Sequence, residues 1–177
     1  MALARRLLML VIPALVCAAV AAGPAVAAAE SGGEDCGKAA WPLASARTRL
    51  AAPVRTVEVG GRLSLPLEGA VTLALSDRAS AALPFPPTRQ GRESRAGFAR
   101  IAVPPPGGDY QITVSDGAWL DVFADGRPLA PLAFTGVHAC PGVRKSLRFR
   151  LPSGEAVLIV TDAAGSRLGM VIDPVGP

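Results

Sequence analysis

The chain has 177 residues, of which 50% are hydrophobic, 18% charged and 5% aromatic, with a formal net charge of +4 at pH 7. It has too few charged residues and too many apolar ones for an intrinsically disordered protein. Its single histidine excludes zinc sites with three histidines and non-haem iron sites with two. A chain of this length is expected to form one domain.

The first 29 residues have the features of a secretory signal peptide. Arg5 and Arg6 precede an apolar stretch at 7–22, and small residues at 27–29 offer cleavage sites. The stretch is shorter than the roughly 20 residues of a membrane-spanning helix, so we expect cleavage rather than anchoring. Removing 1–29 lowers the net charge to +2, which gives no indication of nucleic-acid binding. We therefore predict a periplasmic or secreted protein with no membrane span after cleavage.

Two cysteines, Cys36 and Cys140, remain after the signal peptide. Two cysteines in a protein of an oxidising compartment predict a disulfide. The bond would close a loop of roughly 100 residues, which the chain-entropy relation values at about 4 to 5 kcal/mol of stability. The alternative is a metal or haem site in which His138 joins the two cysteines, but further ligands for a closed site are not evident. We predict no metal and no cofactor.

The mature chain is predicted to consist mainly of strands. A flexible leader occupies 30–40, and apolar residues at helical spacing after Pro42 indicate one short helix at 43–50. Beyond Pro53, short alternating runs are separated by turn signals, with no amphipathic helices between them. This pattern favours an all-β fold, a jelly-roll-like antiparallel β-sandwich of about 8–10 short strands over 41–177. The predicted strands are 55–59, 62–67, 70–76, 97–103, 110–115, 119–124, 134–139, 145–151, 155–161 and 168–173.

A proline-rich stretch at 77–96 interrupts the strand pattern. Proline cannot donate to a sheet ladder, so we expect a long surface loop here. Arg89, Arg92 and Arg95 in this loop either meet an anionic surface or are simply solvated.

The segment 110–124 contains an Asp-Gly turn signal and is predicted to form a hairpin. With a three-residue loop at 116–118, the apolar residues of both strands share the core face, and Trp119 and Asp121 share the outer face. A two-residue loop would instead bury the Asp121 carboxylate, which costs several kcal/mol. An exposed indole beside a carboxylate can hold a sugar ring. The alternative is that Trp119 packs under a neighbouring loop or the helix, and that Asp121 pairs with a base.

A basic segment begins at Arg144 and Lys145. Alternation over 144–151 points its apolar side chains inward and sends Arg148 and Arg150 outward. This ribbon either recruits an anionic partner or protects an edge strand with charge. The candidate ligand-binding residues are therefore Trp119, Asp121, Arg144 and Lys145.

No catalytic constellation is recognised in the sequence. It has no Gly-x-Ser-x-Gly motif for a serine nucleophile, and its Gly-Gly pairs at 60–61 and 107–108 lie between predicted strands rather than before a helix. We therefore predict a non-catalytic protein. The alternative is an enzyme, a hydrolase or an oxygenase, whose site centres on His138 with Asp121 or Asp109.

Three segments, at 41–43, 108–122 and 140–149, carry a resemblance to a known group of proteins. They resemble small exported proteobacterial proteins of unknown function, over nearly the whole mature chain. Some members are labelled homogentisate 1,2-dioxygenase, an activity whose iron site needs two histidines and a carboxylate, whereas this chain has only His138. The strand pattern is also similar to bacterial pre-peptidase C-terminal domains, which implies a β-sandwich without catalytic residues.

The expected function is that of an exported, non-catalytic module of the cell envelope, either structural or ligand-binding. The expected partner is a glycan or an anionic envelope component. Nucleic acid is not expected as a partner.

Overall fold

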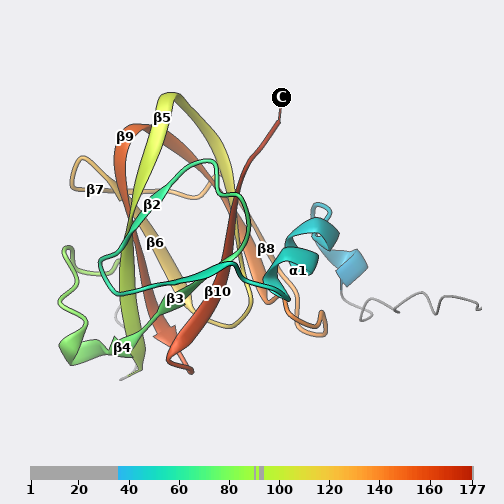
Figure 1. Cartoon of the computed structure of the whole chain (residues 1–177), viewed down its shortest axis with the longest axis horizontal. Coiled ribbons are helices and arrows are strands. Elements are labelled where there is room, and N and C mark those ends of the chain that lie inside the picture. The colour runs from blue at the N-terminus through green and yellow to red at the C-terminus, as the bar shows by residue number, and fades with distance from the viewer. Residues whose placement is uncertain (1–35, 90, 92–93, 177) are drawn as a thin grey trace, which may run out of the picture. The chain divides into compact units, whose positions relative to one another are not determined.

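The computed structural model describes residues 36–89, 91 and 94–176 (Figure 1). The predicted signal peptide, the first part of the predicted leader and Arg92 lie outside the described residues. Within them, a 10-stranded, mostly antiparallel sheet is accompanied by one α-helix and two 3-10 turns. The all-β, sandwich-like fold and the single N-terminal helix are thus confirmed. No helix in the described ranges is long and apolar enough to cross a membrane.

The described part of the chain contains ten strands, one α-helix and two 3-10 turns. They are η1 (Cys36–Lys38), α1 (Ala44–Leu50), β1 (Arg55–Val57), β2 (Arg62–Ser64), β3 (Val71–Ala74), β4 (Ser76–Asp77), η2 (Arg78–Ser80), β5 (Arg95–Val114), β6 (Trp119–Ala124), β7 (Arg127–Leu129), β8 (Ala133–Gly136), β9 (Lys145–Ala163) and β10 (Arg167–Pro174).

Two long strands, β5 and β9, lie side by side and connect the two layers of the fold. They pair antiparallel along their whole length, and the register shifts between Val103 and Gly107 of β5. The partners of these two residues on β9 are Gly154 and Pro152, so both strands change direction at the same place. Figure 1 shows this shared bend at the top of the view.

Each half of the β5–β9 pair belongs to a different layer. In the first layer, 107–114 and 145–152 are flanked by β10, β3 and β1 on one side and by β8 on the other. In the second layer, 95–103 and 154–163 are flanked by β2 and β4 on one side and by β6 and β7 on the other. The β1–β3 and β2–β5 pairs are parallel, which the antiparallel prediction did not anticipate.

The predicted gaps between strands at 104–109 and 152–154 are wrong, because these residues form the bend of two continuous strands. Gly107 has a φ of +84°, and a Cβ at this position would lie 2.5 Å from the carbonyl oxygen of Leu151. Glycine is therefore needed where the two backbones approach each other. Glycine and proline usually indicate a turn, but at this place they bend the two strands without interrupting their pairing.

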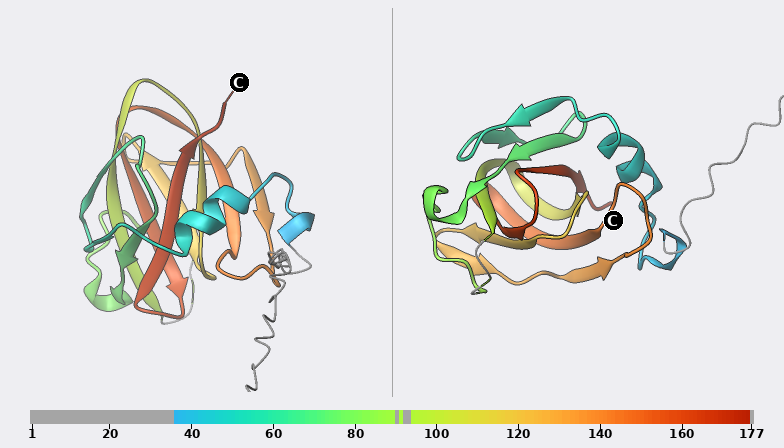
Figure 2. Two further views of the ribbon diagram at one scale, coloured as in Figure 1. Left: turned by 45° about the vertical axis from the view of Figure 1, so that its right-hand side comes forward. Right: turned by 90° about the horizontal axis from the view of Figure 1, so that it is seen from below.

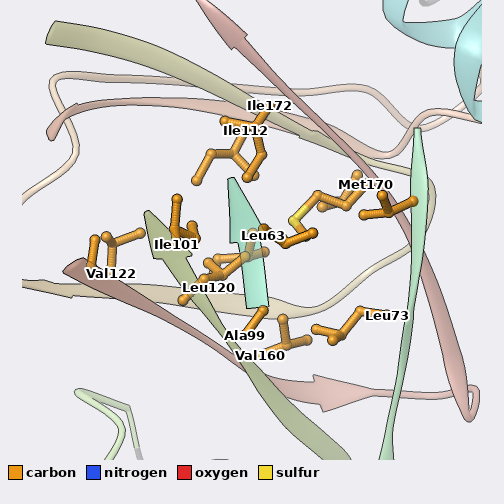
Figure 3. Packing of buried hydrophobic residues seen from close by; sticks show 14 of the residues in the cluster. Leu63, Leu73, Ala99, Ile101, Ile112, Leu120, Val122, Val160, Met170 and Ile172 are labelled. Atoms are coloured by element: carbon orange, nitrogen blue, oxygen red, sulfur yellow. The ribbon is translucent and has the colours of Figure 1, made fainter. Parts of the chain in front are cut away.

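The main core lies between the two layers. Seen from below in Figure 2, strands of both layers surround it, and Figure 3 shows the buried side chains that fill it. Leu63 and Ile101 come from the second layer, whereas Ile112, Met170 and Ile172 come from the first. The predicted inward facing of Leu147, Phe149 and Leu151 is confirmed by their burial in this core.

The predicted hairpin at 110–124 is wrong, because β6 does not pair with the end of β5. β6 pairs with β9 in the second layer, while 110–114 pairs with β9 and β10 in the first. The segment between them therefore crosses from one layer to the other. Leu120 and Val122 still face the same core as Ile112, so the predicted facing of the side chains is confirmed.

The outer face of each layer is covered by a different part of the chain. On the first layer, Leu50 of α1 and the N-cap residue Leu43 are buried in a cluster with Val171 of β10. The predicted disulfide between Cys36 and Cys140 joins the start of the described chain to the same cluster. On the second layer, the segment between η2 and β5 covers β6, with a ring of Phe85 stacked on Phe123 at 4.8 Å between centroids.

Candidate ligand-binding site

A cleft of about 500 Å³ lies where β6 of the second layer approaches the start of β9 in the first. Residues 128–131, which comprise the end of β7 and the first part of its connection to β8, form one wall. Leu120 and Leu147 contribute buried apolar surface, and Phe134 of β8 lies at an exposed position. The volume lies within the range of small-molecule sites, and the mainly apolar lining suits a hydrocarbon or ring.

Asp121 is buried beside this cleft, and both oxygens of its carboxylate accept hydrogen bonds. Its Oδ2 accepts a hydrogen bond from the backbone N–H of Thr88 at 2.9 Å. Its Oδ1 accepts hydrogen bonds from the Thr88 hydroxyl and, at 3.0 Å, from Nε1 of Trp119. The expectation of an exposed carboxylate is wrong, since Asp121 is only 6% exposed. The outer face of β6 is covered by the loop that carries Thr88.

Three cationic side chains lie around Trp119. The Arg89 guanidinium carbon is 5.2 Å from the centroid of the indole, and Lys145 Nζ is 5.9 Å from it. Arg144 precedes Lys145 and donates to the backbone carbonyl of Val137 at 2.9 Å. Within the described part of the chain, none of the three cations forms an ion pair with a carboxylate.

The pKa of Lys145 is lowered in this environment. Burial lowers the pKa of its ammonium group to about 8, and the positive charges of Arg144 and Arg89 contribute to the lowering. The Asp121 carboxylate acts in the opposite direction but does not compensate. The three cations outnumber the carboxylates of Asp121 and Asp162, and a bound anion would offset the excess positive charge.

A second, more polar hollow adjoins the cleft and shares Trp119, Phe134 and Lys145 with it. Arg89, Arg144, His138 and Asp162 also line this hollow. The apolar cleft is consequently continuous with a surface rich in positive charge. An amphiphile with an apolar body and an anionic head has the matching chemistry.

The structure brings the four sequence-predicted candidates together. Trp119, Asp121 and Lys145 line the cleft, and Arg144 lines the adjoining hollow. Arg89, which was expected either to meet an anionic surface or to be solvated, and the 128–131 wall were not among these four candidates. The apolar, proline-containing run after the turn at 125–126 was the available signal for that wall.

The basic ribbon at 144–151 does not protect an edge. Over 145–148 it lies between β5 and β8, so the edge-strand interpretation is wrong for this part of the ribbon. Arg150 pairs with Asp109 at 2.7 Å, and Arg148 lies 4.3 Å from the centroid of the Trp41 ring and donates to Gln111.

The residues of the alternative enzymatic site are not joined to one another. His138 is exposed, and among the described residues it has no hydrogen bond or ion pair to Asp121 or Asp109. The disulfide uses both thiols that the metal alternative requires. No group of three or more His, Cys, Asp or Glu side chains in the described ranges is arranged to hold a metal ion.

Comparisons with known protein families, with curated proteins and with solved structures find no match to this chain.

Proposed function

We propose that the chain is an exported, non-catalytic binding protein of the cell envelope, whose cleft takes an anionic amphiphile. The apolar body of the ligand lies against Leu120, Leu129 and Leu147, and its anionic head lies near Lys145 and Arg144. The observation that carries the proposal is the juxtaposition of an apolar cleft with cations that have no carboxylate partner among the described residues. Electrostatic complementarity at the mouth then orients the ligand.

The exported location rests on two features of the chain. The N-terminal sequence has the order of charge, apolar residues and small residues that is typical of a signal peptide. A disulfide between Cys36 and Cys140 is typical of proteins in an oxidising compartment. A periplasmic or secreted protein satisfies both.

The site geometry favours an anionic amphiphile over a sugar ring. A sugar site at Trp119 and Asp121 needs carboxylate oxygens that accept hydrogen bonds from hydroxyl groups. Both oxygens of Asp121 already accept from Thr88 or Trp119. Arg89 and Lys145 also lie over the indole on which a sugar would stack.

Calorimetric titration with decyl phosphate below its micellar concentration tests the proposal. We expect saturable binding by the exported protein and little binding in Ala130→Trp, because the larger side chain fills the cleft from an exposed wall position. Ala52→Trp, exposed just beyond the end of α1, is the matched control and should bind like the wild type. Absence of saturable binding, or equal binding by both variants, would refute the proposal.

A further inference from the structure

We infer that the edge formed by Leu132 and Phe134, beside the cleft, docks onto an anionic membrane surface. The inference extends the proposed function, because a bilayer is the source from which an amphiphile would enter the cleft. Docking itself requires no occupied cleft, so it is measured separately.

The first observation is the exposure of two large apolar side chains at one place. Leu132 is 54% exposed and Phe134 is 59% exposed, and in the described ranges the other large apolar side chain with such exposure is Val54 at 66%. Leu132 lies in the bend just before β8 and Phe134 is the second residue of β8, so the two exposed side chains are separated by one residue. They form an apolar pair that the fold leaves uncovered.

The second observation is that this pair lies at a strand edge. β8 pairs with β9, and among the described strands it has no partner on its other side. The edge is short and follows Pro131, which cannot donate a backbone hydrogen bond. The edge therefore offers few backbone hydrogen bonds to an added protein strand, whereas binding to a membrane does not depend on such bonds.

The third observation is the position of the cations. Phe134 lines the same hollow as Arg89, Arg144 and Lys145. Apolar side chains that enter the acyl boundary, next to cations that meet lipid phosphates, are the pattern of proteins bound at membrane surfaces. These three cations form no ion pair with a described carboxylate and outnumber the one carboxylate that lines the hollow, Asp162, so an anionic bilayer would offset the excess positive charge.

A second copy of the chain is a poorer occupant of this surface. In a two-fold dimer the same patch faces itself, so Arg89, Arg144 and Lys145 would meet their own copies and repel. Two exposed apolar side chains are also far from the roughly 1,200 Å² that a stable protein interface buries. Charge complementarity thus favours an anionic lipid surface over a second copy of the chain.

Co-sedimentation of the exported protein with vesicles tests the inference. We expect binding to vesicles of phosphatidylcholine mixed with phosphatidylglycerol, weaker binding to phosphatidylcholine alone, and weaker binding as salt rises. Leu132→Ser and Phe134→Ser should each reduce the binding about tenfold, because each removes a large apolar group from the acyl boundary. Val54→Ser is the matched control, since Val54 is more exposed and precedes β1 at the opposite edge of the first layer.

Leu132→Ser also separates this inference from the proposed function. Leu132 does not line the cleft, so this variant should bind decyl phosphate as the wild type does while losing vesicles. Three results would overturn the inference: no vesicle binding by the wild type, an equal loss in Val54→Ser, or a dimer in sedimentation velocity that Leu132→Ser dissociates. A failure of decyl phosphate binding with vesicle binding intact would overturn the proposed function alone.

Discussion

Thr88 donates hydrogen bonds from both its backbone N–H and its hydroxyl to the carboxylate of Asp121, a residue 33 positions later in the chain. These bonds fix the loop before β5 on the outer face of β6. They also place Arg89, the next residue, over the indole of Trp119. One buried carboxylate thus holds both the covering loop and a cation of the proposed site.

Asp121→Asn should lower the free energy of unfolding by about 1 to 3 kcal/mol. The amide replaces one acceptor with a donor, so a Thr88 or Trp119 donor loses its buried partner. Urea unfolding at neutral pH measures the effect. Asp125→Asn, at an exposed turn position with a φ of +50° that asparagine tolerates, is the control and should change stability little. Equal effects of the two substitutions would show that the Asp121 contacts do not stabilise the fold.

Lys145→Met should be more stable than the wild type at neutral pH, and this advantage should shrink as pH rises. The pKa of Lys145 is about 8 in the folded protein and 10.5 in its unperturbed state, so the unfolded chain binds more protons between these values. Wild-type stability therefore rises with pH across this window relative to Lys145→Met, and the cost of the buried charge is fully present below pH 8. Urea unfolding of both proteins from about pH 7 to about pH 10 tests this. A constant difference would contradict the buried, uncompensated charge.

Removal of the disulfide should destabilise the protein without changing its fold. Cys36 and Cys140 are 104 positions apart, and the chain-entropy relation assigns a loop of this length about 4 to 5 kcal/mol. The Cys36→Ala/Cys140→Ala double variant should show this loss in denaturant unfolding. Cys36 and Cys140 of the wild type should resist alkylation unless the protein is first reduced, and alkylation of both thiols without reductant would contradict the bond.

Gly107→Ala should be more destabilising than Gly154→Ala. Both glycines have positive φ, at +84° and +113°, so each substitution carries a backbone strain of about 1 to 3 kcal/mol. A Cβ at Gly107 would also meet the carbonyl oxygen of Leu151 at 2.5 Å, whereas a Cβ at Gly154 meets nothing within 4 Å. Thermal unfolding of the two variants compares their losses of stability. Equal losses would show that the contact between the new Cβ at position 107 and the carbonyl oxygen of Leu151 is readily relieved.

Local patterns in the sequence predicted the faces of the strands but not their neighbours. Alternation identified Leu120 and Val122 as core residues, because side chains alternate between faces regardless of the pairing partner. The same alternation does not say which strand lies alongside, so 119–124 was assigned to the wrong ladder. A glycine at 107 suits either a turn between two strands or a bend within one strand, because both can have a positive φ. The sequence therefore did not distinguish the two.

The candidate site was predicted in part for the same reason. Trp119 and Lys145 were selected from local sequence and lie at one cleft. The burial of Asp121 depends on Thr88, and the contribution of Arg89 depends on how the loop folds back over β6. Contacts over such sequence distances are set by the packing of the layers and leave no periodic signal.

Quenching of tryptophan fluorescence by a chain-brominated decyl phosphate would locate a bound amphiphile in the cleft. The sequence has two tryptophans, so Trp41→Phe leaves Trp119 as the reporter and Trp119→Phe leaves Trp41. Because Trp119 lines the cleft, we predict saturable quenching in Trp41→Phe and none beyond that of free ligand in solution in Trp119→Phe. Equal quenching of the two variants, or no saturable quenching of Trp119, would contradict binding of an anionic amphiphile in this cleft.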